Sequence, residues 1–331
     1  MKISTHSILI TFIIVFFVSA LFLVASPPEM QQLPDNFRAG QVLGVSEAMA
    51  NRSFTSLGYE LPKNNFRPNL PPEKTDKSKD FNFNNCGGAI LDSRTGTLLY
   101  SQDADRVMPI ASISKLASAL VFMDTKPNWE AIYKVKSSDI VGGGKDYIAA
   151  GDEVRVRDLF YLGLVGSINS SIEALVSSTG ISHDDFVKKM NAKAKELGLK
   201  KTNFVEPTGL SDLNVSTPAE VAKLADVAFK NKYIQETSLT ENYEFSTLKG
   251  KKISIDSTDA LLGNFSRNDI KLIGGKTGFT NPAGYCFVGK FTDADGNAVV
   301  SAVLGGQTIS SRFDETKSAI NWVYDSFKWK N

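Results

Sequence analysis

The stretch Pro109–Asp124, PIASISKLASALVFMD, has one charged side chain in its interior, that of Lys115. Its other residues are small or apolar on nearly every face of a helix, a pattern that predicts a buried helix. A buried lysine loses its hydration, so its pKa falls and its neutral, basic form becomes accessible. Ser112 lies three residues earlier, on the same helical face. A hydroxyl beside a neutral amine is a candidate nucleophile with its base.

The composition of the 331-residue chain limits the possible chemistries. Hydrophobic residues make up 42% and charged residues 22%, which is ordinary for a folded protein of one large or two smaller domains. The formal net charge of +1 does not point to a nucleic-acid partner. The histidines are His6 and His183, and the cysteines are Cys86 and Cys286. Two histidines and two cysteines are too few for a metal site built from several imidazoles, a zinc cluster of thiolates or a disulfide framework, and they disfavour a Ser-His-Asp triad. No metal or cofactor is therefore expected.

Two segments precede the part of the chain with folded patterning. Residues 1–26 hold a lysine followed by an apolar run that can span a bilayer, which needs roughly 20 residues. We expect an uncleaved membrane anchor here, with a removed signal peptide as the alternative. Either one places the rest of the chain outside the cytoplasmic membrane. Residues 27–80 hold seven of the twelve prolines, and this composition predicts a flexible tether.

Folded patterning extends from residue 81 to residue 331. Two short strands around a turn at 93–96 come first, and helical patterns occupy residues 156–230. Strand patterns return after residue 250, and an amphipathic helix ends the chain. This order predicts an α+β domain in which one sheet is assembled from both ends, with a helical lobe inserted between them.

Three short motifs follow one another along this domain: S-I-S-K at 112–115, S-I-N at 167–169 and K-T-G at 276–278. Each motif is weak alone. Ser246 with Lys249 also matches the first, and Ser266 with Asn268 also matches the second. Context separates these matches, because only Ser112 opens an apolar helix and K-T-G occurs once, on a predicted strand.

The order, spacing and context of the motifs resemble those of the penicillin-recognising serine hydrolases, most closely the low-mass D-alanyl-D-alanine carboxypeptidases. The phrases DLFYLGLVGSINSS (158–171) and FVKKMNAKAKELGLKKTNFVEPTGL (186–210) are also similar to that family. The resemblance implies a serine β-lactamase/transpeptidase-like fold for residues 81–331, an antiparallel five-stranded sheet flanked by helices with an inserted all-helical lobe. It further implies a place in the bacterial cell envelope, a peptidoglycan stem peptide as substrate and β-lactam antibiotics as covalent inhibitors.

The resemblance also implies roles for the side chains of the first two motifs. Ser112 would attack the carbonyl carbon of the penultimate D-alanine and form an acyl-enzyme, and Lys115 would accept its proton. Burial and the nearby cation Lys276 would keep Lys115 neutral. Ser167 would pass a proton toward the leaving amine, with Lys276 orienting it. Asn169 would hold Lys115 and the substrate's amide.

The same resemblance implies a binding site for the free carboxylate of the terminal D-alanine. Lys276 would supply positive potential there, and Thr277 would hydrogen-bond the carboxylate. Arg312 is similar to an arginine in the family's final segment that also faces this carboxylate. Its alternative is a surface ion pair with Asp314 or Glu315.

The implied oxyanion hole consists of two backbone N–H groups. One belongs to Ser112, and the other belongs to Phe279, which follows Gly278 on the K-T-G strand. Losing one such donor typically costs about 100-fold or more in turnover.

Departures from known patterns bear on the choice of function. Ile168 and Ser170 stand where the family's second motif has glycine and aspartate. Leu210 stands where class A β-lactamases carry a glutamate before Leu-Asn, which disfavours antibiotic hydrolysis as the function. Carboxypeptidase action on stem peptides is the expected function. A DD-endopeptidase is an alternative that the sequence does not separate from it, and a sensor that is acylated only once ranks last.

Several other side chains have structural explanations. Cys86 and Cys286 are expected to be small buried thiols on separate strands, with a disulfide left open by the oxidising compartment. Trp322, Phe327 and Trp329 of the final segment are expected to pack on the sheet rather than insert into lipid.

Overall fold

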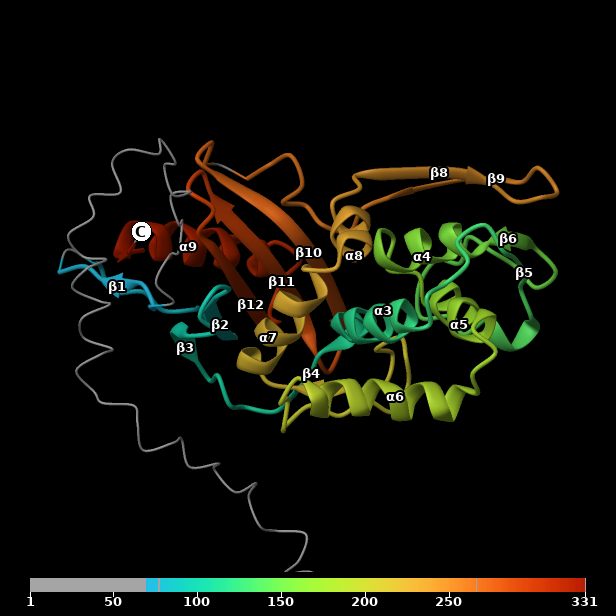
Figure 1. The fold of residues 1–331 in the computed structure, drawn as a ribbon, viewed down its shortest axis with the longest axis horizontal. Helices are drawn as coiled ribbons and strands as arrows, with labels where there is room; N and C mark the ends of the chain where they lie inside the picture. Colours follow the sequence, from blue (N-terminus) through green and yellow to red (C-terminus); the bar gives the residue numbers. More distant parts are fainter. Residues whose placement is uncertain (1–69, 77, 266, 331) are drawn as a thin grey trace, which may run out of the picture. The chain divides into compact units, whose positions relative to one another are not determined.

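The computed structural model describes residues 70–76, 78–265 and 267–330. The predicted membrane anchor and most of the predicted tether lie outside the described residues. The helices and strands follow in this order (Figure 1): β1 (Glu73–Lys74), β2 (Gly87–Asp92), β3 (Leu98–Gln102), β4 (Met108–Pro109), η2 (Ala111–Ser114), α3 (Lys115–Asp124), β5 (Ile132–Lys134), η3 (Ser137–Asp139), β6 (Glu153–Arg155), α4 (Val156–Leu164), α5 (Asn169–Ser178), α6 (His183–Glu196), β7 (Val215–Ser216), α7 (Pro218–Ala228), α8 (Lys232–Ser238), β8 (Asn242–Ser246), β9 (Lys252–Asp256), β10 (Ile270–Thr280), β11 (Gly284–Asp293), β12 (Ala298–Gly306), α9 (Ser311–Ser326) and β13 (Phe327–Lys328).

A five-stranded antiparallel sheet in the order β10-β11-β12-β2-β3 forms the centre of the domain. Strands β2 and β3 come from the start of the domain, whereas β10, β11 and β12 come from its end. The two groups meet where β12 pairs with β2, for example at Ala302 and Ala89. This topology confirms the prediction of one sheet assembled from both ends, and it leaves β10 at a sheet edge.

Alternate residues along the strands enter two different cores, because successive side chains of a strand point to opposite faces of a sheet. Ile90, Phe287 and Val303 belong to the core that includes α9. Leu91 and Val288 belong to the larger core, which continues through the helices between β3 and β10. In Figure 1, α7 crosses one face of the sheet, and α4, α5 and α6 lie beside the sheet. The predicted inserted helical lobe is thereby confirmed.

Two helices that frame the lobe begin at side chains suited to their starts. Ser182 Oγ accepts a hydrogen bond from the backbone N–H of Asp185 and caps α6. Thr217 caps α7 in the same way, and Pro218 occupies the first helical position, where its missing N–H costs nothing.

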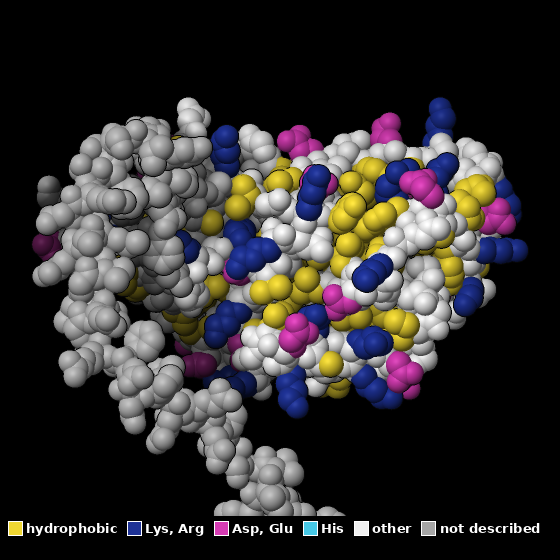
Figure 2. Space-filling view, viewed as in Figure 1, with side chains coloured by type: hydrophobic (Ala, Val, Ile, Leu, Met, Phe, Trp, Pro, Cys, Tyr) yellow, Lys and Arg dark blue, Asp and Glu magenta, His cyan; other side chains and the backbone are white. Residues whose placement is uncertain are grey.

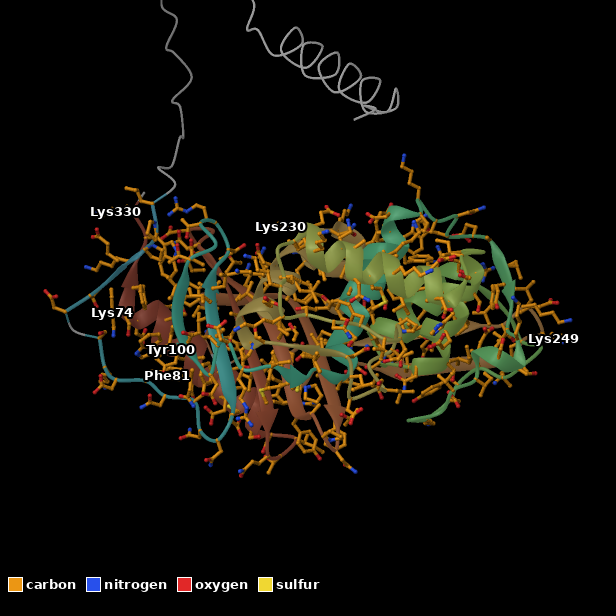
Figure 3. The ribbon with its side chains drawn as sticks, turned by 90° about the horizontal axis from the view of Figure 1, so that it is seen from below. Lys74, Phe81, Tyr100, Lys230, Lys249 and Lys330 are labelled. Atoms are coloured by element: carbon orange, nitrogen blue, oxygen red, sulfur yellow. The ribbon has the colours of Figure 1, made fainter. Side chains whose placement is uncertain are left out.

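The folded part begins upstream of the predicted tether boundary at residue 80. Strand β1 pairs with β13, and the carbonyl of Lys79 accepts a hydrogen bond from Trp322 Nε1 at 2.7 Å. Phe81 stacks on Trp322 with the ring centroids 5.2 Å apart and lies close to Tyr100 (Figure 3). The segment covers apolar surface that the final helix would otherwise expose. A proline-rich and charged composition does not reveal a strand of two residues.

Two further predictions about apolar side chains are confirmed. Trp322 and Phe327 are each 8% exposed, and Trp329 Nε1 donates a hydrogen bond to the carboxylate that ends β2. Cys86 and Cys286 are buried free thiols, and β12 separates the strands on which they lie or which they precede.

Charged side chains are mixed in sign on the face of the domain seen in Figure 2. Lysines and arginines alternate there with aspartates and glutamates, with apolar atoms between them. Within the described part, that face shows no large area of a single sign.

Candidate active site

The predicted buried helix is confirmed with one local difference. Ser112 lies on a 3-10 turn, η2, which leads into α3 at Lys115. The side chain of Lys115 is fully buried. Its Nζ lies 2.8 Å from Ser112 Oγ, 2.7 Å from Asn169 Oδ1 and 2.7 Å from the carbonyl oxygen of Thr208. One amine therefore joins the residues of the first two motifs.

Burial lowers the pKa of Lys115 from 10.5 to about 7. The charges of Glu206 and Glu173 oppose this shift without cancelling it. The pKa of Glu173 is itself raised to about 7, chiefly by burial. A large fraction of Lys115 is therefore neutral near pH 7, which a proton acceptor requires. Desolvation is the largest cause of this shift, and the repulsion between Lys115 and Lys276 appears as a lowering of the pKa of Lys276.

A loop after α6 supplies the third partner of Lys115. The Glu206 carboxylate accepts hydrogen bonds from the backbone N–H groups of Thr208 and Gly209, each at 2.6 Å, and from Asn214 Nδ2 at 3.0 Å. These bonds hold the Thr208 carbonyl against Lys115. Sequence reasoning identified neither residue. Thr208 contributes its backbone carbonyl, so the identity of its side chain gives no signal in the sequence. Glu206 belongs to segment 186–210, which was compared with the family as a whole and not residue by residue.

Gly209 packs directly against the turn that carries the nucleophile. A Cβ at Gly209, where φ is +85°, would lie 1.9 Å from the carbonyl oxygen of Ala111 and 2.8 Å from the backbone nitrogen of Ser112. Ala111 itself has φ of +47°. We expect Gly209→Ala to lower the free energy of unfolding by about 2–3 kcal/mol. We also expect it to slow acylation by at least about tenfold, because Ser112 moves.

A matched control separates the clash from the cost of the backbone conformation. Gly250 has φ of +84°, and a Cβ at this position would have no atom within 4 Å. Gly250→Ala therefore carries only the conformational cost, about 1–2 kcal/mol. Urea unfolding and the rate of penicillin acylation measure both variants. Equal losses of stability and unchanged acylation in both variants would show that Gly209 does not hold the nucleophile turn.

The K-T-G motif lies on β10, as predicted, and its lysine is buried. Lys276 is 2% exposed, and its Nζ donates hydrogen bonds to Ser167 Oγ at 2.9 Å and to the Thr277 carbonyl at 3.0 Å. Burial, followed by the charges of Lys115 and Arg312, lowers the pKa of Lys276. The site therefore contains two serine–lysine pairs, Ser112 with Lys115 and Ser167 with Lys276.

Gly278 allows β10 to pass close to the nucleophile. A Cβ at this position would lie 2.9 Å from the Ile110 carbonyl oxygen and 3.2 Å from the backbone nitrogen of Ser112. The backbone of the strand that continues into Phe279 thus runs beside the backbone of Ser112. The two N–H groups of the expected oxyanion hole come from these two adjacent segments.

Two neighbours of the K-T-G strand were not identified from the sequence. Thr258 Oγ1 lies 2.5 Å from Thr277 Oγ1. The next residue, Asp259, is 6% exposed, and burial raises the pKa of its carboxyl to about 6, while Lys276 and Arg312 oppose the shift. Both residues precede β10 by many positions, and only the tertiary fold brings them to it.

Arg312 lines the cleft and is buried, so it does not lie on the open surface. It is 8% exposed, its Nη1 donates a hydrogen bond to the Gly278 carbonyl at 3.2 Å, and its guanidinium lies 5.6 Å from the ring centroid of Tyr285. Within the described part it forms no ion pair with Asp314 or Glu315, so the surface alternative is wrong.

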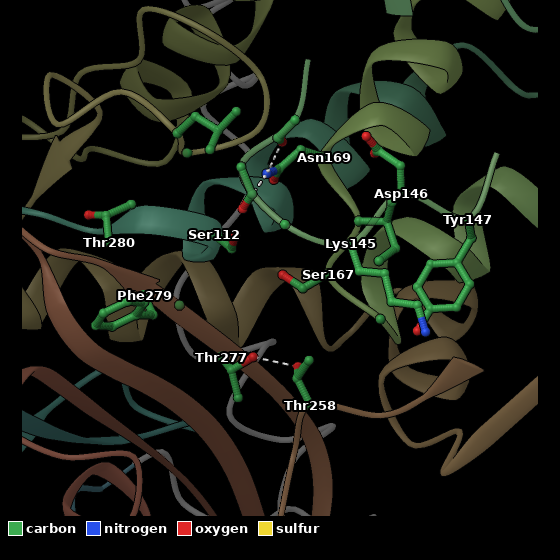
Figure 4. Close-up of a pocket in the computed structure, with 18 of the residues that line it drawn as sticks. Ser112, Lys145, Asp146, Tyr147, Ser167, Asn169, Thr258, Thr277, Phe279 and Thr280 are labelled. Atoms are coloured by element: carbon green, nitrogen blue, oxygen red, sulfur yellow. Dashed lines mark hydrogen bonds between the residues drawn. The ribbon is translucent and has the colours of Figure 1, made fainter. Parts of the chain in front are cut away.

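The three motifs and Arg312 surround a cleft of about 340 Å³, shown in Figure 4. The residues that line it and belong to the sequence-based site are Ser112, Ser167, Asn169, Thr277, Gly278, Phe279 and Arg312. Lys115 and Lys276 lie behind the serines of the lining. The nine candidate residues therefore converge on one cleft.

Ser170, one of the departures from the family pattern, and Asn169 hold one wall of this cleft in place. Ser170 Oγ donates a hydrogen bond to Asp146 Oδ1 at 2.6 Å and accepts one from the backbone N–H of Val141. Asn169 Nδ2 donates to the carbonyl of Gly142 at 3.0 Å. These bonds fasten the glycine-rich segment 142–147, which includes Lys145 and Tyr147 in Figure 4, over the second motif.

The competing match to the first motif lies away from the cleft. Ser246 and Lys249 are exposed at the end of the β8–β9 hairpin, and Figure 3 shows Lys249 at the extremity of the domain. Ser266 lies outside the described residues. The motif matches that were selected because they lie on an apolar helix and on a strand are the ones that meet at the cleft.

The fold and the paired serine–lysine geometry define a class of protein. The structure is similar to the crystal structure of the Streptomyces K15 DD-transpeptidase, with a TM-score of 0.69 and 27% identity over 75% of this chain and 99% of that chain. It is also similar to Penicillin-Binding Protein D2 from Listeria monocytogenes in its ampicillin-bound form, with a TM-score of 0.63 and 32% identity over 74% and 98% of the two chains. The domain has the serine β-lactamase/transpeptidase fold.

The chain belongs to the D-alanyl-D-alanine carboxypeptidase family, Peptidase S11, whose model matches residues 78–308. It is 34% identical over 225 residues to a D-alanyl-D-alanine endopeptidase of Pseudomonas aeruginosa, covering 67% of this chain and 72% of the relative. It is 30% identical over 256 residues to a D-alanyl-D-alanine carboxypeptidase of Streptomyces sp. strain K15, covering 72% and 86%. The protein is a serine-type D-Ala-D-Ala peptidase, a hydrolase that acts on peptidoglycan.

Proposed function

We propose that Ser112 is the nucleophile of this D-Ala-D-Ala carboxypeptidase and that Lys115 is its base. The observation that carries the proposal is the 2.8 Å separation of Lys115 Nζ from Ser112 Oγ inside a fully buried pocket. As Oγ bonds to the carbonyl carbon of the penultimate D-alanine, its proton passes to Nζ. The carbonyl oxygen then carries negative charge, which the N–H groups of Ser112 and Phe279 stabilise.

The second serine–lysine pair, Ser167 with Lys276, supplies the proton that the leaving group takes. As the peptide C–N bond breaks, the departing D-alanine nitrogen takes the proton of Ser167 Oγ, which Lys276 replaces from its own ammonium across 2.9 Å. A water molecule then attacks the ester carbon and gives its proton through Ser167 to the neutral Lys276 amine. The Lys115 ammonium returns its proton to Ser112 Oγ as the ester bond breaks, so the carboxylic acid leaves and both lysines regain their starting states. Asn169, held by Lys115, positions the amide of the substrate.

A cluster of cations receives the terminal carboxylate. Arg312 and Lys276 are both buried at this part of the cleft, and Thr277 adds a hydroxyl. Burial lowers the pKa of Lys276, so a carboxylate that enters favours its charged form, while the Arg312 guanidinium stays charged throughout. This charge arrangement selects substrates that end in a free carboxylate, and penicillins share that feature.

Acylation is expected to depend on pH through Lys115. Only the neutral amine accepts a proton, and its pKa is lowered to about 7. The second-order rate constant for acylation by a fluorescent penicillin should therefore rise about tenfold per pH unit below 7 and level off above it, since this constant reports the free enzyme. A constant rate between pH 5 and 8, or a rise centred near 10, would be inconsistent with Lys115 as the base.

The purified domain tests the activity directly. We expect it to release D-alanine from a peptide that ends in D-Ala-D-Ala and to be labelled covalently by a fluorescent penicillin. Rapid turnover of the antibiotic would instead support a β-lactamase, and permanent labelling without peptide turnover would support a sensor. The apolar side chain of Leu210 in the cleft lining favours slow antibiotic hydrolysis.

A DD-endopeptidase is the second candidate function. The Pseudomonas aeruginosa relative is named a D-alanyl-D-alanine endopeptidase and is more similar in sequence than the Streptomyces carboxypeptidase. An endopeptidase cuts the same D-alanyl bond where the leaving amine belongs to a cross-linked stem. Comparing kcat/KM for a linear pentapeptide and for a cross-linked dimer separates the two activities.

We further propose that residues 1–26 anchor the protein to the cytoplasmic membrane and that residues 27–69 tether the domain outside it. The proposal rests on the apolar run and on the proline content of the sequence. Within the described residues, none of the helices is both long and apolar enough to span a bilayer. Fractionation of cells that produce the full chain tests the anchor, and recovery in the growth medium would indicate a cleaved signal.

A further inference from the structure

The open end of β10 sets the direction in which a substrate leaves the cleft. Toward its start the strand is closed, because Gly274 packs against the ring of Phe229, where a Cβ would lie 2.5 Å from ring atoms. Toward its end the strand is open, and Phe279 is 46% exposed. The proposed function places the terminal carboxylate at Lys276 and Arg312. The part of the substrate upstream of the scissile bond therefore has an open path along the strand past Phe279.

An exposed aromatic pair lies at this exit. Phe279 stacks on Tyr285 with ring centroids 4.3 Å apart and an interplanar angle of 25°. The two residues face each other across the β10–β11 pairing, one residue pair before the turn. Such a flat apolar surface suits the carbon skeleton of a chain that passes over it.

A second hollow of about 830 Å³ lies on the other side of this turn. Thr280 lines the catalytic cleft and the next residue, Asn281, lines the hollow, so the two spaces meet at the same turn. The hollow is rich in side-chain amides, and its polar lining consists of Asn84, Asn85, Gln102, Asp103, Arg106, Asn281 and Gln307.

The amides of this hollow fall into two groups. The side chain of Gln102 is already hydrogen-bonded within the protein, because it accepts a hydrogen bond from the Phe83 N–H at 3.0 Å and donates one to the Phe83 carbonyl at 2.7 Å. Asn85, Asn281 and Gln307 make no side-chain hydrogen bonds within the described part of the protein. An amide side chain offers donors and an acceptor together and has no charge, which matches hydroxyl and acetamido groups.

We propose that this hollow is a subsite for the N-acetylated amino sugar to which a stem peptide of peptidoglycan is attached. The inference rests on the proposed function. A strand rises about 3.4 Å per residue, so Thr280, where β10 ends, lies about 3.4 Å beyond Phe279, and Asn281 follows it in the turn. Four extended stem residues upstream of the scissile bond span about 13 Å. The stem therefore crosses the aromatic pair, and its sugar end reaches the unpartnered amides.

Two substrates with the same pentapeptide test the subsite, one free and one linked to N-acetylmuramic acid. For the unaltered protein we expect a KM about five- to tenfold lower for the sugar-linked substrate. The double variant Asn281→Ala/Gln307→Ala should lose this advantage, while its KM for the free peptide and its rate of penicillin acylation stay within twofold. The control pair Gln235→Ala/Asn268→Ala removes amides that also make no side-chain hydrogen bonds but lie outside the hollow, and it should change neither KM.

Failure of the subsite is distinguishable from failure of the proposed function. Direct binding of both substrates to Ser112→Ala protein, measured by calorimetry, does not require turnover. Equal dissociation constants for the two substrates would overturn the subsite whether or not D-alanine is released. A loss of affinity for both substrates in the double variant would likewise overturn it, and would indicate that the hollow binds the peptide. If Arg106→Ala weakened the free peptide while the amide variants had no effect, an acidic stem residue would be the occupant instead.

Discussion

Replacing Ser112 with alanine is expected to abolish covalent labelling by penicillin and to lower D-alanine release by on the order of 10³-fold or more. The variant removes the oxygen that forms the ester, and no other hydroxyl in the described part lies within hydrogen-bond distance of Lys115 Nζ. Gel fluorescence after incubation with a labelled penicillin and an assay of released D-alanine measure the two effects. Residual activity would come from binding and the oxyanion hole alone.

The chain contains a matched control for this substitution. Ser246 also stands three residues before a lysine, yet it is exposed on β8, far from the cleft. Ser246→Ala should keep full labelling and full D-alanine release. Persistent labelling of Ser112→Ala protein, with the adduct mapped to another residue by mass spectrometry, would remove Ser112 as the nucleophile.

Replacing Lys115 with methionine is expected to slow acylation by about 10²–10⁴-fold while the protein stays folded. Methionine has a similar length and fills the buried space, but it accepts no proton. The change leaves Asn169 Oδ1 and the Thr208 carbonyl without their partner, which costs stability. It also removes a buried amine whose charged form is unfavourable, which offsets that cost. We therefore expect the thermal unfolding midpoint to stay within a few degrees.

Lys249→Met is the control for the loss of a lysine in a matching motif. Lys249 is exposed, and its Nζ makes a long hydrogen bond to the Gly151 carbonyl at 3.4 Å. The acylation rate of this variant should equal that of the unaltered protein at every pH. Acylation of Lys115→Met protein at an undiminished rate would show that another group, such as Lys276 through Ser167, takes the proton of the nucleophile.

The sequence was sufficient to predict the parts of the site that depend on local pattern. A helix that is apolar on nearly every face is expected to be buried together with its one interior lysine, and Lys115 is fully buried. K-T-G on a strand pattern placed Lys276 and Thr277 on β10. The class of fold followed from the order of strands and helices together with the three motifs.

The contributions that were missed depend on contacts between distant segments. Thr258 reaches Thr277 only after the chain has turned from β9 into β10. Thr208 contributes a backbone carbonyl, which any residue could supply. Glu206 acts by ordering the loop that presents this carbonyl. No spacing rule in one sequence identifies such partners, because the distance along the chain does not measure the distance in space.

The helix start at the nucleophile also differs from the simple expectation. The sequence placed Ser112 at the first turn of a regular helix, but it lies on a 3-10 turn after Ala111, which has a positive φ. Close packing against Gly209 and Gly278 imposes this shape. Local propensity favours neither feature, since a left-handed conformation is unfavourable for alanine.

The central position of β12 in the sheet determines when the domain can fold during its synthesis. Its partner β2 is synthesised near the beginning of the domain, and the pairing of Ala89 with Ala302 waits until β12 has been synthesised. Until then the β2–β3 hairpin exposes an unpaired edge that can join other chains. Contacts between such remote segments slow folding. We therefore expect truncation before β12 to yield insoluble aggregates rather than a smaller enzyme, and productive folding to begin only after β12 has left the ribosome.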